Sequence, residues 1–313
     1  MITEADVPAA DITPADIIAA RRRIEGRIRR TPVFEAAPEL VFKLEYLQHT
    51  GSFKARGALN NVLAAQERGD LGPAGVIAAS GGNAGLAVAW AAAQVGVPAE
   101  IHVPANAPAV KVKRLQALGA TVVQTGTEYS HALAASADRA TQTGAFVCHA
   151  YDQPEMVAGA GTIALELIED TTVDTVLVAV GGGGLVGGIA AALADTPVRV
   201  VGVEPVAAPS LHTALDRGGP VDVEVGGYAA DSLGARRAGR IAYAVAERTA
   251  MVSALVEDAA IREARQRLWD EWRIVAEPGA AAAYAGLTAY RPAPGERVAV
   301  IVCGANTDPS DLT

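Results

Sequence analysis

One lysine in a glycine-bearing stretch suggests covalent chemistry. The segment EYLQHTGSFKARGALNNV (45–62) contains Lys54, one of four lysines in a chain with 22 arginines. A primary amine can attack a carbonyl carbon, whereas a guanidinium stays protonated and attacks poorly. Ser52 is placed to cap a following helix, so Lys54 falls in the first turn, where the helix dipole disfavours an ammonium. We expect either a reactive amine of lowered pKa at this position or a solvated residue at the start of a surface helix.

A hydrophobic strand that runs into four glycines and a helix is the second candidate. In TVLVAVGGGGLVGGIAAAL (175–193) the glycines let backbone N–H groups close on an anion, and the helix N-terminus adds a favourable dipole. A bound phosphate is the expected guest, and a plain tight turn is the alternative. GGGLVG (182–187) also satisfies the G-x-G-x-x-G pattern, with Glu204 at the end of the next strand, so a nicotinamide or flavin oxidoreductase is a competing interpretation.

Two further turns carry polar or thiol side chains after a strand. In AASGGNAGLAVAW (78–90), Ser80 and Asn83 either receive a carboxylate or cap the helix that follows. VAVIVCGAN (298–306) ends a strand in Cys303, and a free cysteine is usually a buried small hydrophobe. Each turn is a weak signal by itself.

The elements that must position these turns alternate between strands and helices. A helix is expected over 14–30 and a strand over 40–47, and βα arrays follow over about 75–150 and after residue 151. This alternation predicts an α/β fold with mostly parallel sheets in two lobes. A ligand is expected between the lobes, at the carboxyl ends of the strands.

Composition excludes several classes of function. The net charge is −9 and no basic block is present, which argues against nucleic acid and anionic membranes as partners. No segment is long and apolar enough to span a bilayer, and the acidic N-terminus lacks the basic start of a secretory signal. Two cysteines, Cys148 and Cys303, make no disulfide framework, which favours a reducing, cytoplasmic compartment.

Taken together, the motifs resemble those of the fold-type II pyridoxal phosphate enzymes, most closely the serine/threonine dehydratases and serine racemases. They occur in the family's order and spacing over nearly the whole chain. The matching segments are KLEYLQHTGSFKARGA (43–58), SGGNAG (80–85), GAGTIALE (159–166), GGGGLVGG (181–188), GVEP (202–205) and CGAN (303–306). The dinucleotide-dependent oxidoreductase becomes a distant alternative, because it explains only one of these segments.

The resemblance implies a domain organisation. The fold would be like that of the tryptophan synthase β subunit, with two lobes of three-layer α/β/α architecture. Residues 1–70 and 151–313 would form a large domain that binds pyridoxal phosphate, and residues 71–150 a small domain. A homodimer or homotetramer is also expected.

The resemblance also implies a role for each turn. Lys54 would hold pyridoxal phosphate covalently and act in catalysis, with Phe53 against the ring, Asn83 at the 3′ oxygen and Cys303 facing the pyridine nitrogen. The backbone amides that hold the phosphate would be those of Gly181, Gly182, Gly183, Gly184 and Leu185. The substrate carboxylate would be received by Ser80, Asn83 and the amide of Ala84.

The implied reaction is the β-elimination of water from a small amino acid, serine or threonine, giving a 2-oxo acid and ammonia. Serine racemase and threo-3-hydroxyaspartate dehydratase are alternatives within the family. Racemases of the family place a second serine where this chain has Gly81, which carries no exchangeable side-chain proton, so weak or absent racemisation is expected.

A cation site is suggested by the same resemblance. Glu204 and the carbonyl of Ala208 match two of the family's metal ligands, but Ser210 stands where a carboxylate would be. Losing that oxygen weakens a divalent site, so a divalent cation, a monovalent cation and none all stay open. Asp231 and Glu277 lie in segments that match family loops near the active site.

Overall fold

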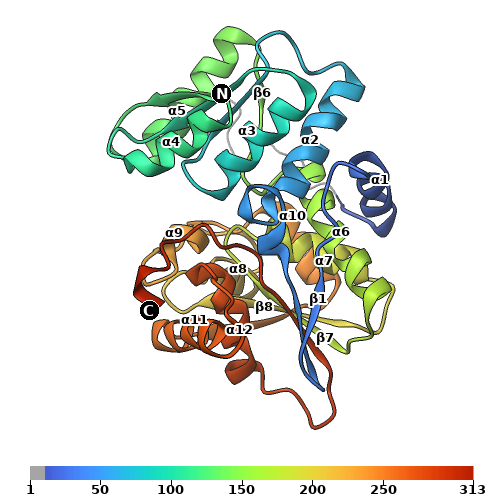
Figure 1. The fold of residues 1–313 in the computed structure, drawn as a ribbon. Coiled ribbons are helices and arrows are strands. Elements are labelled where there is room, and N and C mark those ends of the chain that lie inside the picture. Colours follow the sequence, from blue (N-terminus) through green and yellow to red (C-terminus); the bar gives the residue numbers. More distant parts are fainter. Residues whose placement is uncertain (1–10, 313) are drawn as a thin grey trace.

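Two β-sheets organise residues 11–312, the part of the chain that this computed structural model describes (Figure 1). The large sheet has the order β1-β2-β10-β7-β8-β9, and the small sheet has the order β5-β4-β3-β6. The β1–β2 pair is antiparallel and the other pairs are parallel. The strands are β1 (Val33–Ala37), β2 (Leu40–Lys43), β3 (Val76–Ala79), β4 (Ala99–Val103), β5 (Thr121–Gln124), β6 (Phe146–Val147), β7 (Thr175–Ala179), β8 (Arg199–Pro205), β9 (Val252–Val256) and β10 (Val298–Ile301).

Helices cover both sheets, and each sheet with its helices forms one lobe (Figure 1). The helices of the large lobe are α1 (Pro14–Ile24), α6 (Pro154–Asp170), α7 (Gly184–Leu193), α8 (Ser210–Arg217), α9 (Ala230–Leu233), α10 (Arg240–Arg248), α11 (Asp258–Trp272) and α12 (Pro278–Tyr290). Those packed with the small sheet are α3 (Asn83–Val95), α4 (Ala109–Ala117) and α5 (Tyr129–Thr143), and α2 (Lys54–Arg68) packs against α3. The expected α/β fold of two lobes with mostly parallel sheets is confirmed.

Each lobe has its own apolar core. The core of the large lobe contains the fully buried Val178, Ile189 and Val300, and that of the small lobe contains Leu59 and Ile101. The expected division of the chain at residues 70 and 151 assigns α2 to the large domain, but α2 supplies side chains to the small-lobe core. That division stays a prediction.

Helix α2 also crosses α6 at close range, where two glycines face each other. A Cβ atom at Gly57 would lie 2.5 Å from the carbonyl oxygen of Met156, and one at Gly159 would lie 2.7 Å from the Cα of Gly57. Side chains at these positions would push the helices apart, so the glycines set the distance between α2 and α6. This contact fixes the start of α2, where Lys54 lies.

Three local expectations are wrong. The helix expected over 14–30 ends at Ile24, before Gly26 takes a left-handed φ of 73°. The strand expected over 40–47 ends at Lys43, and a 3₁₀ turn, η2 (Glu45–Leu47), follows it. Ser52 does not cap α2: Phe53 is the residue that precedes the helix, and the Ser52 hydroxyl is buried without a hydrogen-bond partner among the described residues. None of the helices in 11–312 has both the length and the apolar character needed to cross a bilayer.

Candidate active site

The start of α2 is held against the end of β10. The Phe53 amide donates to the carbonyl of Cys303 at 3.0 Å, and Ser52 pairs with Gly304 in a short antiparallel bridge. These contacts bring together two turns that are far apart in the sequence. The Lys54 amine lies beside them and donates to the carbonyl of Ala150 at 2.7 Å.

The Lys54 amine has an environment that favours its neutral form. Burial lowers the pKa of Lys54 to about 8, while nearby Cys303 and Glu277 act in the opposite direction. Within residues 11–312 no carboxylate lies within ion-pair distance of its Nζ. Because a neutral amine is the nucleophilic form, the fraction of Lys54 ready to react near neutral pH is far larger than for an ordinary lysine, although the ammonium still predominates.

Phe53 and Cys303 complete the surroundings of this amine. Nζ of Lys54 lies 5.0 Å from the centroid of the Phe53 ring. Cys303 is buried, and burial together with the charge of Glu277 raises the pKa of its thiol. The thiol is therefore neutral at physiological pH and can act only as a weak hydrogen-bond donor.

The glycine loop between β7 and α7 forms a cradle whose shape requires bare backbone. A Cβ atom at Gly182 would lie 2.4 Å from the ring of Tyr151, and one at Gly184 would lie 2.7 Å from the Tyr151 carbonyl oxygen. The first N–H groups of α7 have no partner within the helix, and no acidic residue occupies its first turn. Such a loop is suited to a phosphate group.

One cavity connects Lys54 with Gly184, at the end of this loop. Its lining residues are Phe53, Lys54, Gly57, Ala150, Tyr151, Met156, Ala160 and Gly184. A nucleophilic amine and a helix N-terminus free of acidic residues thus share one space. This set of donors fits a phosphorylated aldehyde such as pyridoxal phosphate.

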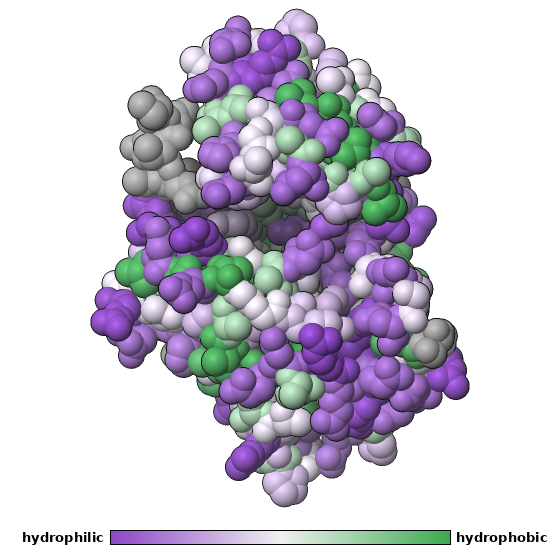
Figure 2. Space-filling view, turned by 90° about the vertical axis from the view of Figure 1, so that its left-hand side faces the viewer, coloured by the Kyte–Doolittle hydropathy of each residue, from purple (hydrophilic) through white to green (hydrophobic). Residues whose placement is uncertain are grey.

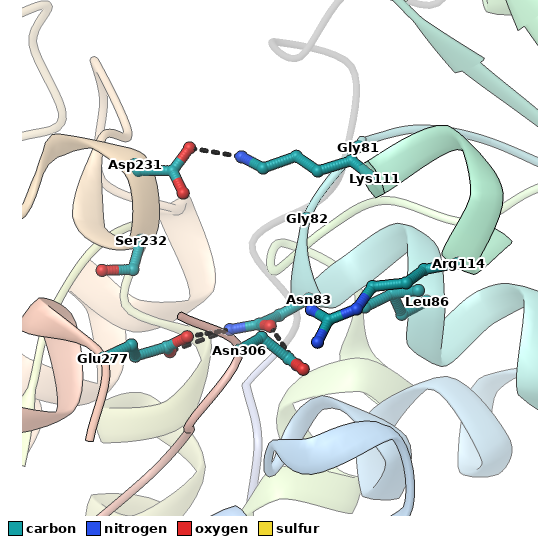
Figure 3. A pocket seen from close by; sticks show the side chains of 10 residues that line it. All are labelled: Gly81, Gly82, Asn83, Leu86, Lys111, Arg114, Asp231, Ser232, Glu277 and Asn306. Atoms are coloured by element: carbon teal, nitrogen blue, oxygen red, sulfur yellow. Dashed lines mark hydrogen bonds and ion pairs between the residues drawn. The ribbon is translucent and has the colours of Figure 1, made fainter. Parts of the chain in front are cut away.

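A second pocket lies between the lobes, next to the start of α3 (Figure 3). The surface is hollowed between the two lobes in the space-filling view (Figure 2). The residues that line the pocket are Gly81, Gly82, Asn83, Leu86, Lys111, Arg114, Asp231, Ser232, Glu277 and Asn306. It therefore contains side chains from α3 and α4 on one side and from α9, the N-cap residue of α12 (Glu277) and the C-terminal segment on the other.

Asn83 is the centre of the hydrogen bonds in this second pocket. Its Nδ2 donates to both carboxylate oxygens of Glu277, at 2.8 and 3.0 Å. Its Oδ1 accepts from Nδ2 of Asn306 at 2.7 Å. Burial raises the pKa of Glu277, against the bond from Asn83, which acts to lower it.

The residues expected to receive a substrate carboxylate surround the start of α3. Asn83 begins the helix and lines the second pocket, whereas Ser80 and Ala84 lie beside it. The Ser80 hydroxyl accepts a bond from the Gly82 amide at 3.3 Å. The amide of Ala84 belongs to the first turn, whose N–H groups have no partner within the helix.

Glu204, expected as a cation ligand, is placed as a helix cap. Its carboxylate accepts the amides of Leu211 at 2.8 Å and His212 at 2.7 Å, at the start of α8. Burial raises the pKa of Glu204 to about 7, although these amides act to lower it. In 11–312 no group of three or more His, Cys, Asp or Glu side chains is arranged to hold a metal ion.

Ser210 connects this cap to the glycine loop. Its hydroxyl donates to the carbonyl of Gly181 at 2.7 Å. Ala208 is buried just before α8. A cation bound by Glu204 and Ala208 would compete with the amides that Glu204 already accepts, and this site stays a prediction.

Sequence reasoning missed two cations in the second pocket, Lys111 and Arg114. Both belong to α4, three residues apart, and such a pair reads as an ordinary solvated helix face. The scarcity of lysine in this chain was the available signal for Lys111. Arg114 carried no signal, because arginine is abundant here.

Known proteins resemble this chain in sequence and in structure. A family model described as "Pyridoxal-phosphate dependent enzyme" matches residues 24–304. The biosynthetic L-threonine dehydratase IlvA of Corynebacterium glutamicum is 36% identical, over 95% of this chain and 72% of that protein. Phenylserine dehydratase of Ralstonia pickettii is 35% identical, over 93% of this chain and 92% of that protein.

A solved structure extends the likeness to three dimensions. Maize serine racemase superposes with a TM-score of 0.90 at 29% identity, over 97% of this chain and 96% of that one. The family match supports the phosphate interpretation of the glycine loop over the dinucleotide one. With Lys54 and Gly184 of the glycine loop lining one cavity, and with a family model covering most of its length, the chain belongs to the pyridoxal-phosphate dependent enzymes.

Proposed function

We propose that this protein is a pyridoxal-phosphate-dependent dehydratase that removes water from serine or threonine and releases ammonia and a 2-oxo acid. The observation that carries the proposal is the cavity that Lys54 shares with Gly184, at the start of α7. Relatives named threonine dehydratase and threonine ammonia-lyase, at 34 to 37% identity, support it.

The cofactor would be held by residues already described. Lys54 would bind it covalently beside Phe53, the amides of the 181–185 loop would take its phosphate, and Cys303 and Asn83 would face its ring. When bound, pyridoxal phosphate withdraws electrons from the Cα atom of the amino acid.

The protein's own groups would then move the protons. The Lys54 amine, with its lowered pKa, accepts the Cα proton as a general base. The neutral thiol of Cys303 would place no negative charge near the ring nitrogen of a bound cofactor. Such a weak donor would favour loss of the β-hydroxyl.

Gly81 supports elimination over racemisation. It lines the second pocket beside Asn83 and offers no side-chain proton on that face. A racemase needs a second acid–base group opposite the first, and Lys54 supplies only one.

The Lys54→Ala variant tests the proposal. We expect loss of the visible absorbance of the bound cofactor and a fall in ammonia release of at least about a thousandfold, because both functions of the amine are removed. Lys54→Arg serves as the matched control and should not restore turnover, since guanidinium keeps the charge without the nucleophile.

The assay follows ammonia, 2-oxo acid and D-serine from L-serine and L-threonine. Normal turnover in Lys54→Ala would contradict the assignment of the amine. D-serine formed faster than pyruvate by the unmodified enzyme would contradict the choice of elimination.

We propose in addition a homodimer or homotetramer in the cytoplasm. The two cysteines are free and buried, which is compatible with a reducing compartment. A bound monovalent or divalent cation near Glu204 and Ala208 completes the proposal, and activity assays after chelation and with added K⁺ or Mg²⁺ test it.

A further inference from the structure

Two cations of α4 reach the second pocket from the small lobe. Lys111 and Arg114 are three residues apart, so they lie on the same face of the helix. The chain as a whole carries a net charge of −9, so two cations converging on one pocket are not explained by composition. Figure 3 shows both side chains extending from α4 toward the opposite wall.

The two cations differ in whether an acidic side chain pairs with them. Lys111 donates to the Asp231 carboxylate at 2.6 Å, across the mouth between α4 and α9. Arg114 makes no hydrogen bond or ion pair to any residue within 11–312. Its guanidinium points toward Asn83 and Asn306 (Figure 3).

The acids of the pocket do not compensate Arg114. Asp231 is already paired with Lys111. Glu277 accepts both of its bonds from Asn83, and burial raises its pKa toward the neutral form. The pocket therefore holds one positive charge without a partner, on a side chain whose planar donors suit a carboxylate.

The geometry points to a second carboxylate on the substrate. Under the proposed function, on which this inference rests, the substrate's own α-carboxylate would lie at Ser80, Asn83 and the amide of Ala84, and Asn83 lines the pocket that Arg114 faces. We propose that Arg114 binds the carboxylate carried by Cβ, so that the preferred substrate is a β-hydroxy dicarboxylic amino acid of the 3-hydroxyaspartate type. Serine and threonine lack this group and leave Arg114 solvated.

The reaction itself is unchanged by this assignment. The Cα proton and the Cβ hydroxyl leave as water, and hydrolysis of the product then consumes one water. The net change converts 3-hydroxyaspartate into ammonia and a four-carbon 2-oxo dicarboxylate, with no oxidant or reductant needed.

Steady-state kinetics of the holoenzyme test the assignment. We expect a higher kcat/KM for 3-hydroxyaspartate than for serine or threonine. Arg114→Ala should lower kcat/KM for 3-hydroxyaspartate about 10- to 100-fold, the value of a hydrogen-bonded charge, with a much smaller fall for serine. Arg114→Lys should recover part of the loss. Lys113 is exposed on the same helix and lies outside the pocket. The matched control Lys113→Ala should leave kcat/KM unchanged for both substrates.

The outcomes separate this inference from the proposed function. An equal fall for serine and 3-hydroxyaspartate in Arg114→Ala would overturn the inference, because Arg114 would then serve the α-carboxylate or the fold. Turnover of serine or threonine without a preference for 3-hydroxyaspartate would also overturn it, while leaving the proposed function intact. No ammonia from any of the three substrates would overturn the proposed function.

A binding measurement gives a second readout without turnover of the β-hydroxyl. L-aspartate and L-asparagine have nearly the same shape and differ in the charge at the group assigned to Arg114. Calorimetry on the holoenzyme should show tighter binding of aspartate than of asparagine, and Arg114→Ala should remove the difference. Equal binding of the two by the unmodified enzyme would contradict the assignment.

Discussion

Lys43 and Lys54 lie close together in the sequence, and burial lowers the pKa of both, but only Lys43 has a carboxylate partner among residues 11–312. Lys43 has no exposed surface, and its Nζ donates to the Glu166 carboxylate and to the carbonyl of Thr31, both at 2.7 Å. The amine of Lys54 donates to one carbonyl and has no carboxylate within ion-pair distance among residues 11–312. A buried amine paired with a carboxylate is structural, whereas one that lacks a counter-charge is available for chemistry.

Lys43 belongs to what we call the buried ion cluster, formed by Lys43, Glu45, Arg56 and Glu166. Arg56 is 1% exposed and bonds to Glu45 through two nitrogens, both at 2.8 Å, and to Glu166 at 2.7 and 2.8 Å. The cluster joins β2 and η2 to α2 and α6. Because Arg56 follows Lys54 by two residues, the cluster also anchors the helix turn that carries the reactive amine.

Breaking the cluster should have the largest effect on stability. Arg56→Met leaves two buried carboxylates with too few partners, and we expect a loss of about 3–5 kcal/mol in the free energy of unfolding. Arg68→Met, which removes exposed ion pairs to Asp70 and Glu155, is the control and should cost about 0–1 kcal/mol. Urea denaturation measures both. Similar losses in the two variants would show that the cluster is no more important than surface pairs.

Replacing each lysine by methionine tests the comparison directly. Lys43→Met should cost about 1.5–3 kcal/mol, because Glu166 loses one charged donor but keeps Arg56. Lys54→Met should change stability by about 1 kcal/mol or less, since the amine lost is one that burial already disfavours in its charged form. A larger loss of stability from Lys54→Met than from Lys43→Met would refute the contrast.

Chemical labelling should show the smallest of the expected differences between Lys54 and Lys43, and it is the measurement most specific to the amines. The pKa of Lys54, lowered from 10.5 to about 8, means that its free amine is present well below the pH at which ordinary lysines deprotonate. Acylation of the cofactor-free protein, followed by peptide mass spectrometry, should give a midpoint near pH 8 for Lys54 and little labelling of Lys43. An apparent midpoint above pH 10 for Lys54 would contradict the lowered pKa of its amine.

Much of the site could be predicted from the sequence, because glycines and a rare lysine mark backbone turns. The cradle at 181–184 and the Lys54 turn belong to this class, as does the α/β alternation. Ser52 illustrates the limit of such local reasoning. Pairing of Ser52 with Gly304 determines that turn, so the expected cap does not form and the Ser52 hydroxyl is buried without a partner among the described residues.

Charged residues at ordinary helical spacing were beyond prediction. Arg114 and Lys111 are recognisable only once α4 is placed across from α9, and Glu166 only once α6 lies against α2. Glu45 and Lys43 sit in a segment that reads as a continuous strand, so nothing local indicated a buried cluster. Tertiary placement decides which charges find partners, and that information is spread over the whole chain.

The bonds of Asn83 have a consequence for how the molecule opens. Asn83 belongs to the small lobe, whereas Glu277 and Asn306, which it bonds, lie on the large-lobe side. Any swing of one lobe away from the other must pull this amide from its acid, and the freed carboxylate lies in the electrostatic reach of both Lys54 and Cys303. Opening of the lobes to admit a ligand is therefore coupled, through the Asn83 side chain, to the charge environment of the Lys54 amine.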